Sequence, residues 1–163
     1  MVTIRNAGDE DWPLWSALRR SALAEAPYAF TPRAADWHRG EEDRWRTMSA
    51  APGSCNLIAE RAGEPLGMAR IVPGDETGCY EIRSVWVAPA ARGLGVGDRL
   101  LAACEERAGR LGARSLRLLV VPGNPAAIAL YLRNGFTTSP EPGPPLPDGV
   151  TRQKVMRKAV SAS

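Results

Sequence analysis

A glycine-rich segment at residues 92–97 places the strongest constraint on how this chain can fold. It reads Arg-Gly-Leu-Gly-Val-Gly and joins the apolar run 85–87 to a segment whose apolar residues have helical spacing. This pattern predicts a strand, a tight turn and the start of a helix. The first N–H groups of a helix lack backbone partners and lie at its positive end, so the turn is suited to an anion. A phosphate or pyrophosphate is the expected occupant, and an ordinary glycine turn is the alternative.

The spacing of the glycines narrows the choice of phosphate ligand. Glycine lacks a Cβ atom, so the backbone can approach a ligand closely and can adopt positive φ. A nucleoside-triphosphate loop ends in Gly-Lys-Ser/Thr, whereas Gly97 is followed by Asp98 and Arg99. A dinucleotide fingerprint requires a third glycine after two intervening residues beyond Gly95, and Asp98 takes that place. Neither ATP nor NAD is therefore the expected ligand.

The segment after the turn predicts a helix, a buried strand and a second, shorter helix. Apolar residues recur at helical spacing from Leu100 to Leu111, and Gly112 follows as a stop signal. Residues 115–121 form an apolar run typical of a buried strand. The shorter helix carries its own boundary signals, with Asn124 as N-cap and Pro125 in the first position. Gly135 suits the position just beyond its end.

With these residues in place, the chain resembles the GCN5-related N-acetyltransferases, the GNAT family. The acetyl-CoA loop of that family has the pattern Gln/Arg-x-x-Gly-x-Gly/Ala, and a later motif combines an Asn near a helix start with a Tyr before Gly-Phe. The residues that match the two motifs are Arg92, Gly95, Gly97, Asn124, Tyr131, Gly135 and Phe136. Both motifs lie at the usual separation, and together they cover roughly residues 81–136. The remainder of the chain matches only in its pattern of elements.

The resemblance implies an α/β (α+β) fold in which helices flank a mixed, mostly antiparallel central sheet. The implied order is β-α-α-β-β-β-α-β-α-β-β, in a single GNAT domain over residues 1–163. Periodicity places strands near 2–5, 57–60, 65–72, 80–87, 115–121 and 154–157, with helices from Asp9 and over about 34–49. Residues 57–60 and 65–72 flank a turn at Gly63 and predict a hairpin. Residues 140–147 are rich in proline and predict a loop.

Composition excludes several other classes of protein. A chain of 163 residues with 44% hydrophobic and 24% charged residues is typical of a globular domain with a core. No apolar run is long enough to cross a membrane and no signal segment is evident, so a cytoplasmic location is expected. The cysteines Cys55, Cys79 and Cys104 are odd in number and widely spaced, which supports neither disulfides nor a metal site. The net charge of +3 includes no basic block, so no nucleic-acid partner is expected.

The resemblance also assigns acetyl-CoA as the donor substrate. Backbone N–H groups from Leu94 to Asp98 would bind its pyrophosphate, and residues 85–87 would pair with the pantetheine arm as an added strand would. An N–H at Val85 or Trp86 would polarise the acetyl carbonyl, and Asn124 would contact the cofactor. The expected cofactor-binding residues are Val85, Trp86, Val87, Arg92, Gly93, Leu94, Gly95, Val96, Gly97, Asp98, Asn124 and Tyr131. The Asp98 side chain itself is interpreted as a helix-start residue.

Tyr131 and Glu81 are the candidate catalytic residues. A phenol stays protonated at neutral pH, so Tyr131 is the expected general acid for the leaving thiolate, with a core tyrosine as the alternative. Glu81 is the candidate base, acting through water. Simple strand alternation would place Glu81 with Val85 on one face and Ile82 with Trp86 on the other. The alternative for Glu81 is a carboxylate paired with Arg83 or another arginine.

The acceptor is the least constrained part of the prediction. In the family, the first two helices and their connecting loop help to build the acceptor pocket, and the residues there are Tyr28, Phe30, Trp37, Glu41, Glu42, Asp43 and Trp45. Aromatic rings with carboxylates suit a cation with an apolar body, although tryptophan at helical spacing is also typical of core packing. An amino-acid-like amine, a polyamine, an antibiotic and a protein amino group all stay open. The single histidine, His38, lies outside both motifs and is interpreted as a helix-surface residue.

The motifs are compatible with two functions. The first is an acetyl-CoA-dependent N-acetyltransferase that acetylates a primary amine of a small molecule or peptide by direct transfer in a ternary complex. A covalent route through Cys79 is the less favoured mechanism. The second is a catalytically silent acyl-CoA-binding module of the same fold that acts as a sensor or partner domain. No membrane partner is expected, and a homodimer stays open.

Overall fold

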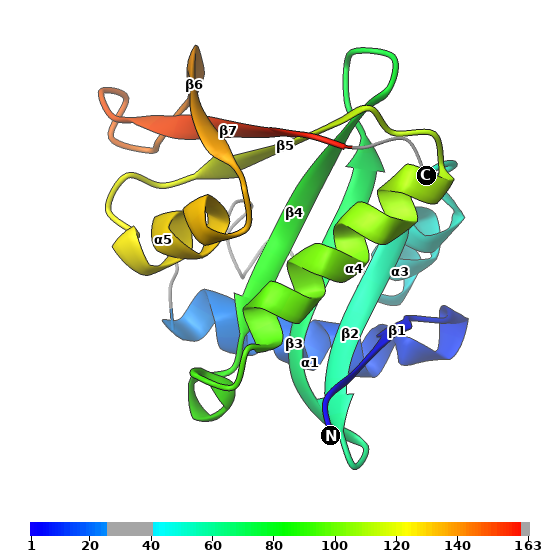
Figure 1. Cartoon of the computed structure of the whole chain (residues 1–163). Helices are drawn as coiled ribbons and strands as arrows, with labels where there is room; N and C mark the ends of the chain where they lie inside the picture. The colour runs from blue at the N-terminus through cyan, green and yellow to red at the C-terminus, as the bar shows by residue number, and fades with distance from the viewer. Residues whose placement is uncertain (26–40, 161–163) are drawn as a thin grey trace.

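The computed structural model describes residues 1–25 and 41–160, in which seven strands form one sheet of order β1-β2-β3-β4-β5-β7-β6 (Figure 1). The strands are β1 (Thr3–Asn6), β2 (Cys55–Arg61), β3 (Glu64–Pro73), β4 (Cys79–Val87), β5 (Ser115–Val120), β6 (Thr137–Pro145) and β7 (Arg152–Ala159). The helices are α1 (Trp12–Glu25), α3 (Glu41–Ala50), α4 (Val96–Arg110) and α5 (Pro125–Arg133). This order confirms the predicted fold class. None of the helices in the described ranges is long and apolar enough to cross a membrane.

Helices cover both faces of the sheet and divide the core into two parts. Helix α4 crosses one face, while α1 and α3 cover the other (Figure 1). Successive side chains of β2 point to opposite faces and so contribute to both parts of the core. Leu57 and Ala59 pack on the α4 side, and Ile58 packs on the side of α1 and α3. On the latter side Trp15 and Trp45 lie with ring centroids 5.3 Å apart and are almost fully buried. Trp45 therefore belongs to the core, as the packing alternative predicts.

Strands β4 and β5 run parallel and separate before they end. Their pairing extends from Cys79 with Ser115 to Ile82 with Leu118, although β4 continues to Val87 and β5 continues to Val120. The other neighbouring strands in the described sheet are antiparallel. Figure 1 shows β5 turning away from β4 toward β7. The result is an opening in the sheet at the carboxyl ends of the two parallel strands, where α/β folds commonly bind ligands.

A β-bulge in β4 corrects the predicted assignment of faces. Arg83 pairs with Arg70 and Trp86 pairs with Met68, so three steps along β4 match two steps along β3. The extra residue is Ser84, which has φ of +57°. Past the bulge the faces are exchanged. Val85 consequently packs on the α4 side with Ile82, and Trp86 packs on the opposite side.

Glu81 and Val85 therefore do not share a face, contrary to the alternation prediction. Ile82 points to the α4 side, so the preceding residue Glu81 points to the side of α1 and α3. The physical reason is the unpaired extra residue, which shifts the pleat by one position.

Two local predictions at the ends of the chain also need correction. The first α-helix does not begin at Asp9 but at Trp12, because Asp9–Asp11 form a 3₁₀ turn after Gly8, whose N–H donates to Asp11 Oδ2 at 2.6 Å. The proline-rich segment predicted as a loop lies largely in β6. Proline cannot donate to a strand ladder, but β6 is an edge strand with an irregular register against β7, so its prolines are tolerated.

Candidate active site

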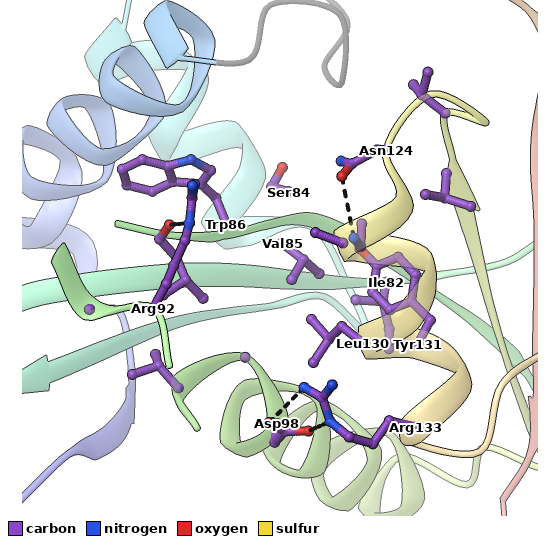
Figure 2. A pocket seen from close by; sticks show the side chains of 18 of the residues that line it. Ile82, Ser84, Val85, Trp86, Arg92, Asp98, Asn124, Leu130, Tyr131 and Arg133 are labelled. Carbon is purple, nitrogen blue, oxygen red and sulfur yellow. Dashed lines mark hydrogen bonds and ion pairs between the residues drawn. The ribbon is translucent and has the colours of Figure 1, made fainter. Parts of the chain in front are cut away.

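A cavity of about 620 Å³ lies in the opening between β4 and β5. Figure 2 shows the end of β4, the turn before α4 and the first turns of α5 converging on this space. Of the twelve expected cofactor-binding residues, all except Leu94 line it, and Leu94 is exposed. Glu81 is not among the lining residues. The cavity also takes in residues that the sequence motifs did not indicate, among them Arg83, Ser84, Leu130, Arg133 and residues 119–121 at and just beyond the end of β5.

The glycine turn has the geometry of an anion cradle. Gly93 and Gly95 have φ of +83° and +77°, and Gly95 is the N-cap of α4. A Cβ atom at either position would meet no protein atom within 4 Å, so both glycines face open space. The first N–H groups of α4, at residues 96–98, have no partner inside the helix and lie at the positive end of its dipole. These residues therefore fit a phosphate group.

Gly97 differs from the other two glycines. It lies in α4 and is buried, and a Cβ atom there would lie 3.0 Å from Leu130 Cδ2 of α5. The absence of a side chain at Gly97 thus allows α5 to approach α4, rather than providing positive φ.

Asp98 joins the start of α4 to the end of α5 across the site. Its carboxylate accepts hydrogen bonds from Arg133 Nε at 3.0 Å and Nη2 at 3.1 Å (Figure 2). It also accepts one from Asn134 Nδ2 at 2.8 Å. The Arg133 guanidinium, with Asn134, holds the pKa of Asp98 below its usual value. Because these partners already occupy the carboxylate, the Asp98 side chain has a structural role at the helix start.

Arg92 closes the end of the cavity near α1. Its Nε donates to the carbonyl oxygen of Val87 at 3.2 Å, and its Nη2 forms an ion pair with Glu25 at the end of α1. These contacts fix the glycine turn to the end of β4. The arginine of the loop motif thus positions the cradle through its side chain.

Tyr131 projects from α5 into the cavity with its ring against Phe136. The two ring centroids are 6.1 Å apart in an edge-to-face arrangement, and only 7% of Tyr131 is exposed. Burial raises the pKa of Tyr131, so the phenol stays protonated well beyond neutral pH. Within the described part of the chain its hydroxyl makes no hydrogen bond, so a ligand in the cavity can serve as its partner. The Gly-Phe pair after Tyr131 anchors the ring through Phe136.

Asn124 caps α5, as the sequence predicts. Its Oδ1 accepts a hydrogen bond from the N–H of Ala127 at 3.3 Å, and Pro125 takes the first helical position. Asn124 also lines the cavity (Figure 2). The helix beyond it ends before Gly135, which has φ of +91°.

Glu81 lies between two arginines. It is 4% exposed, and its Oε2 accepts from Arg83 Nε at 2.7 Å while its Oε1 accepts from Arg117 Nη1 at 2.6 Å. Both carboxylate oxygens are therefore engaged, which is the arrangement of the ion-pair alternative.

One signal in the sequence could have indicated that Arg83 and the end of β5 line the cavity. It is the parallel pairing of β4 with β5, since ligands bind where such strands end.

Among the remaining candidate residues, those that the structure describes do not line the cavity. Tyr28, Phe30, Trp37 and His38 lie outside the described residues, while Glu41 and Glu42 form ion pairs with Arg20 and Arg46. Asp43, on α3, is not a lining residue.

The cysteines are likewise outside the cavity. Burial raises the pKa of Cys104 to about 12, and Cys79 is buried with its sulfur 3.7 Å from Arg157 Nη1.

Comparison with known proteins places the chain in a family. The model of the acetyltransferase (GNAT) family matches residues 15–136, a span that includes the glycine turn, β5 and α5. The chain belongs to the GNAT family. The match confirms the resemblance drawn from the two motifs, and the cavity lies where the GNAT motifs meet.

The chain is also similar to relatives named as acetyltransferases and shares its fold with solved structures. The chain is 35% identical to an IAA acetyltransferase of Azospirillum brasilense, over 61% of this chain and 65% of that protein. It is 32% identical to an L-methionine sulfoximine/L-methionine sulfone acetyltransferase of Pseudomonas aeruginosa, over 85% of this chain and 81% of that protein. The match to the Azospirillum protein, unlike that to the Pseudomonas protein, spans less than two thirds of the relative's length. The YncA protein of Salmonella typhimurium, solved with acetyl-CoA, shares the fold with a TM-score of 0.80 and 23% identity, covering 100% of this chain and 96% of that one.

Proposed function

We propose that this protein is an acetyl-CoA-dependent N-acetyltransferase that acetylates a primary amine of a small molecule or peptide. The observation that carries the proposal is one continuous cavity, which extends from the glycine cradle at the start of α4 to the buried hydroxyl-bearing ring of Tyr131. A cradle for phosphate at one end and a proton donor at the other suit a long thioester substrate. The names of the relatives and the acetyl-CoA bound to the Salmonella protein support the same donor.

The open edge of β4 would hold the pantetheine arm. Pairing between β4 and β5 stops at Ile82, so the backbone of residues 83–87 on that edge is available to an extended ligand. Amide groups of the arm would take the place of a neighbouring strand. The acetyl carbonyl would then lie at Val85 or Trp86, where a backbone N–H polarises it.

The transfer itself conserves atoms and protons. The neutral amine nitrogen attacks the thioester carbonyl carbon, so that a C–N bond forms and the C–S bond breaks. Tyr131 gives its proton to the departing sulfur. The ammonium loses two protons: the first, lost before the attack, passes to water, and the second, lost after it, reprotonates Tyr131. Because burial raises the pKa of Tyr131, the phenol is in its donating form whenever an amine is available to react.

The base that receives the first ammonium proton stays a prediction. Glu81 could act only through water, because its oxygens are occupied by Arg83 and Arg117 and it does not line the cavity. Replacing Glu81 with Gln separates the two roles. Loss of the acidic limb of the pH–rate profile, where the rate rises as a base loses its proton, would indicate a base. An unchanged profile with lower stability would indicate a structural carboxylate.

Release of the free thiol from acetyl-CoA, measured across a panel of amines, tests the proposed function. We expect turnover with at least one amine and N-acetylated product by mass spectrometry, together with a higher melting temperature in acetyl-CoA. Thermal stabilisation by acetyl-CoA without turnover of any amine would instead support the silent acyl-CoA-binding module. Absence of both effects would contradict any acetyl-CoA function.

A further inference from the structure

Arg83 differs from the other charged residues that line the cavity. The charged lining residues are Glu25, Arg83, Arg92, Asp98 and Arg133. Four of these form pairs within the lining, Arg92 with Glu25 and Arg133 with Asp98. The charge of Arg83 has no opposite charge among the described residues of the lining, so the lining carries one surplus positive charge at this position.

The partner of Arg83 lies behind it and is shared. Glu81 accepts from both Nε and Nη2 of Arg83 through one oxygen, at 2.7 and 2.6 Å, and its other oxygen accepts from Arg117. One carboxylate thus faces two guanidinium groups and cannot neutralise both. The contact uses the Nε–Nη2 side of the Arg83 guanidinium. Its outer side, which carries Nη1, bonds to no other described residue, and 58% of the side chain is exposed.

The location of Arg83 points to the acceptor rather than to acetyl-CoA. The phosphate cradle lies beyond the other end of this stretch of β4, while Val85, where the acetyl carbonyl is expected, is two residues away from Arg83. At about 3.3 Å per residue the backbones of these two positions are separated by roughly 7 Å or less. The long arginine side chain can therefore reach a group on an acceptor whose amine lies at the thioester.

A second arginine lies at the bulge that follows Arg83. Arg19 of α1 is 5% exposed, and its Nη1 donates to Ser84 Oγ at the bulge at 3.3 Å. Burial lowers its pKa to about 10, so it is still charged at neutral pH. The surplus charge of Arg83 disfavours an acceptor with only cationic groups, such as a polyamine, and favours one that brings an anion.

We propose that the acceptor is an amine that also carries a carboxylate, as a free amino acid does, and that Arg83 binds this carboxylate. The inference rests on the proposed N-acetyltransferase function and narrows its acceptor. A planar guanidinium matches a carboxylate in geometry and charge, and Glu81 keeps that guanidinium oriented toward the cavity. The positive charge also favours the neutral, reactive form of the nearby amine.

Matched acceptor pairs test the inference in steady-state kinetics. Phenylalanine with phenethylamine, tyrosine with tyramine and leucine with isoamylamine each differ only in the carboxylate. We expect the amino acid of a productive pair to have a kcat/KM about 10- to 100-fold higher than its decarboxylated amine, as for a hydrogen bond to a charged group. In Arg83→Gln the KM for the amino acid should rise by that factor, whereas kcat/KM for the amine should not fall.

Arg117→Gln is the matched control, because Arg117 binds the same Glu81 but does not line the cavity. It should retain the preference for the carboxylate, and Arg83→Lys should retain part of it. Thermal stabilisation by acetyl-CoA in Arg83→Gln, equal to that of the wild type, would show that the variant folds and binds the donor.

The kinetics distinguish failure of the Arg83 inference from failure of the proposed N-acetyltransferase function. Turnover of both members of a pair without preference, or equal losses for both in Arg83→Gln, would overturn the role of Arg83 while N-acetyl transfer stands. Absence of turnover with every amine, with or without a carboxylate, would contradict the proposed function and this inference with it.

Discussion

Leu130 of α5 occupies the space that a side chain on Gly97 of α4 would need. Its Cδ2 atom lies 3.0 Å from the ideal Cβ position of Gly97, which is closer than nine in ten real Cβ contacts allow. This approach brings the first turn of α4 beside the turn of α5 that carries Tyr131. The phosphate cradle and the proton donor consequently border one cavity.

Replacing Gly97 with Val should therefore destabilise the protein by about 1–3 kcal/mol, the usual cost of overpacking. The cost should shrink when the same replacement is made in a Leu130→Ala background, because the opposing side chain is then absent. Denaturant unfolding of the four proteins gives the coupling energy between the two positions. Strictly additive losses would contradict direct packing of Gly97 on Leu130.

Gly95→Ala should weaken acetyl-CoA binding at least about ten-fold with only a modest loss of stability. Positive φ costs a non-glycine residue about 1–2 kcal/mol, and the added methyl group would face the open cradle where phosphate is expected. Gly149→Ala is the matched control, since Gly149 has φ of +72°, equally open surroundings and no place in the cavity lining. Both variants should lose similar stability by denaturant unfolding, and calorimetry should find weaker binding in Gly95→Ala alone. Equal affinities would contradict the cradle.

Tyr131→Phe should lower kcat by about 10²- to 10⁴-fold, the usual range for loss of a general acid. The affinity for acetyl-CoA should barely change, because the ring and its contact with Phe136 are retained. Tyr80→Phe serves as the control, since the Tyr80 hydroxyl bonds to the carbonyl of Leu111 at 3.4 Å and lies outside the cavity lining. Equal losses in kcat and in donor affinity would remove the assigned role of Tyr131.

The raised pKa of Tyr131 predicts how stability depends on alkaline pH. In the unfolded chain the phenol ionises near its ordinary pKa of about 10, whereas burial delays ionisation in the folded protein. Above about pH 10 the unfolded state therefore binds fewer protons, and stability falls as the pH rises toward the folded-state pKa. Tyr131→Phe should lose less stability over this interval than the wild type. Melting temperatures measured from pH 8 to 11 would test this, and parallel curves would contradict a raised pKa.

Asp98→Asn should strengthen acetyl-CoA binding several-fold at low ionic strength. The replacement removes a negative charge beside the phosphate cradle and releases Arg133 from its ion pair. The carboxylate is charged at neutral pH, because its lowered pKa means that protonation requires a pH below its usual value near 3.8. Raising the salt concentration should reduce the gain, since salt screens exposed charges. Weaker binding at low salt would show that the Asp98–Arg133 pair orders the cradle instead.

Much of the candidate site follows from local signals in the sequence. Asn124, Pro125 and Gly135 bracket α5 as predicted, because capping hydrogen bonds and positive φ involve residues close together in the chain. The positive φ of Gly95 follows in the same way from a turn that must feed a helix. Such features depend on the backbone within a few residues and are legible in one sequence.

Other features depend on strands that are distant in sequence. The prolines of residues 140–145 belong to a strand because β7 lies on one side and the other side is an edge. The role of Gly97 depends on Leu130, which lies beyond a whole strand. Strand alternation gave the wrong face for Glu81 relative to Val85, because the bulge at Ser84 is defined by the register between β4 and β3.

The sequence by itself determined most of the helices and strands, the glycine turn at the start of a helix and the tyrosine that follows it, since each is encoded by neighbouring residues. Only the tertiary structure decided which side chains share the cavity. The separation of β4 from β5 and the bulge at Ser84 place Arg83 in the lining and Glu81 behind it. Both depend on pairing between strands far apart in the chain, and the pairing energy of a strand is not contained in its own residues.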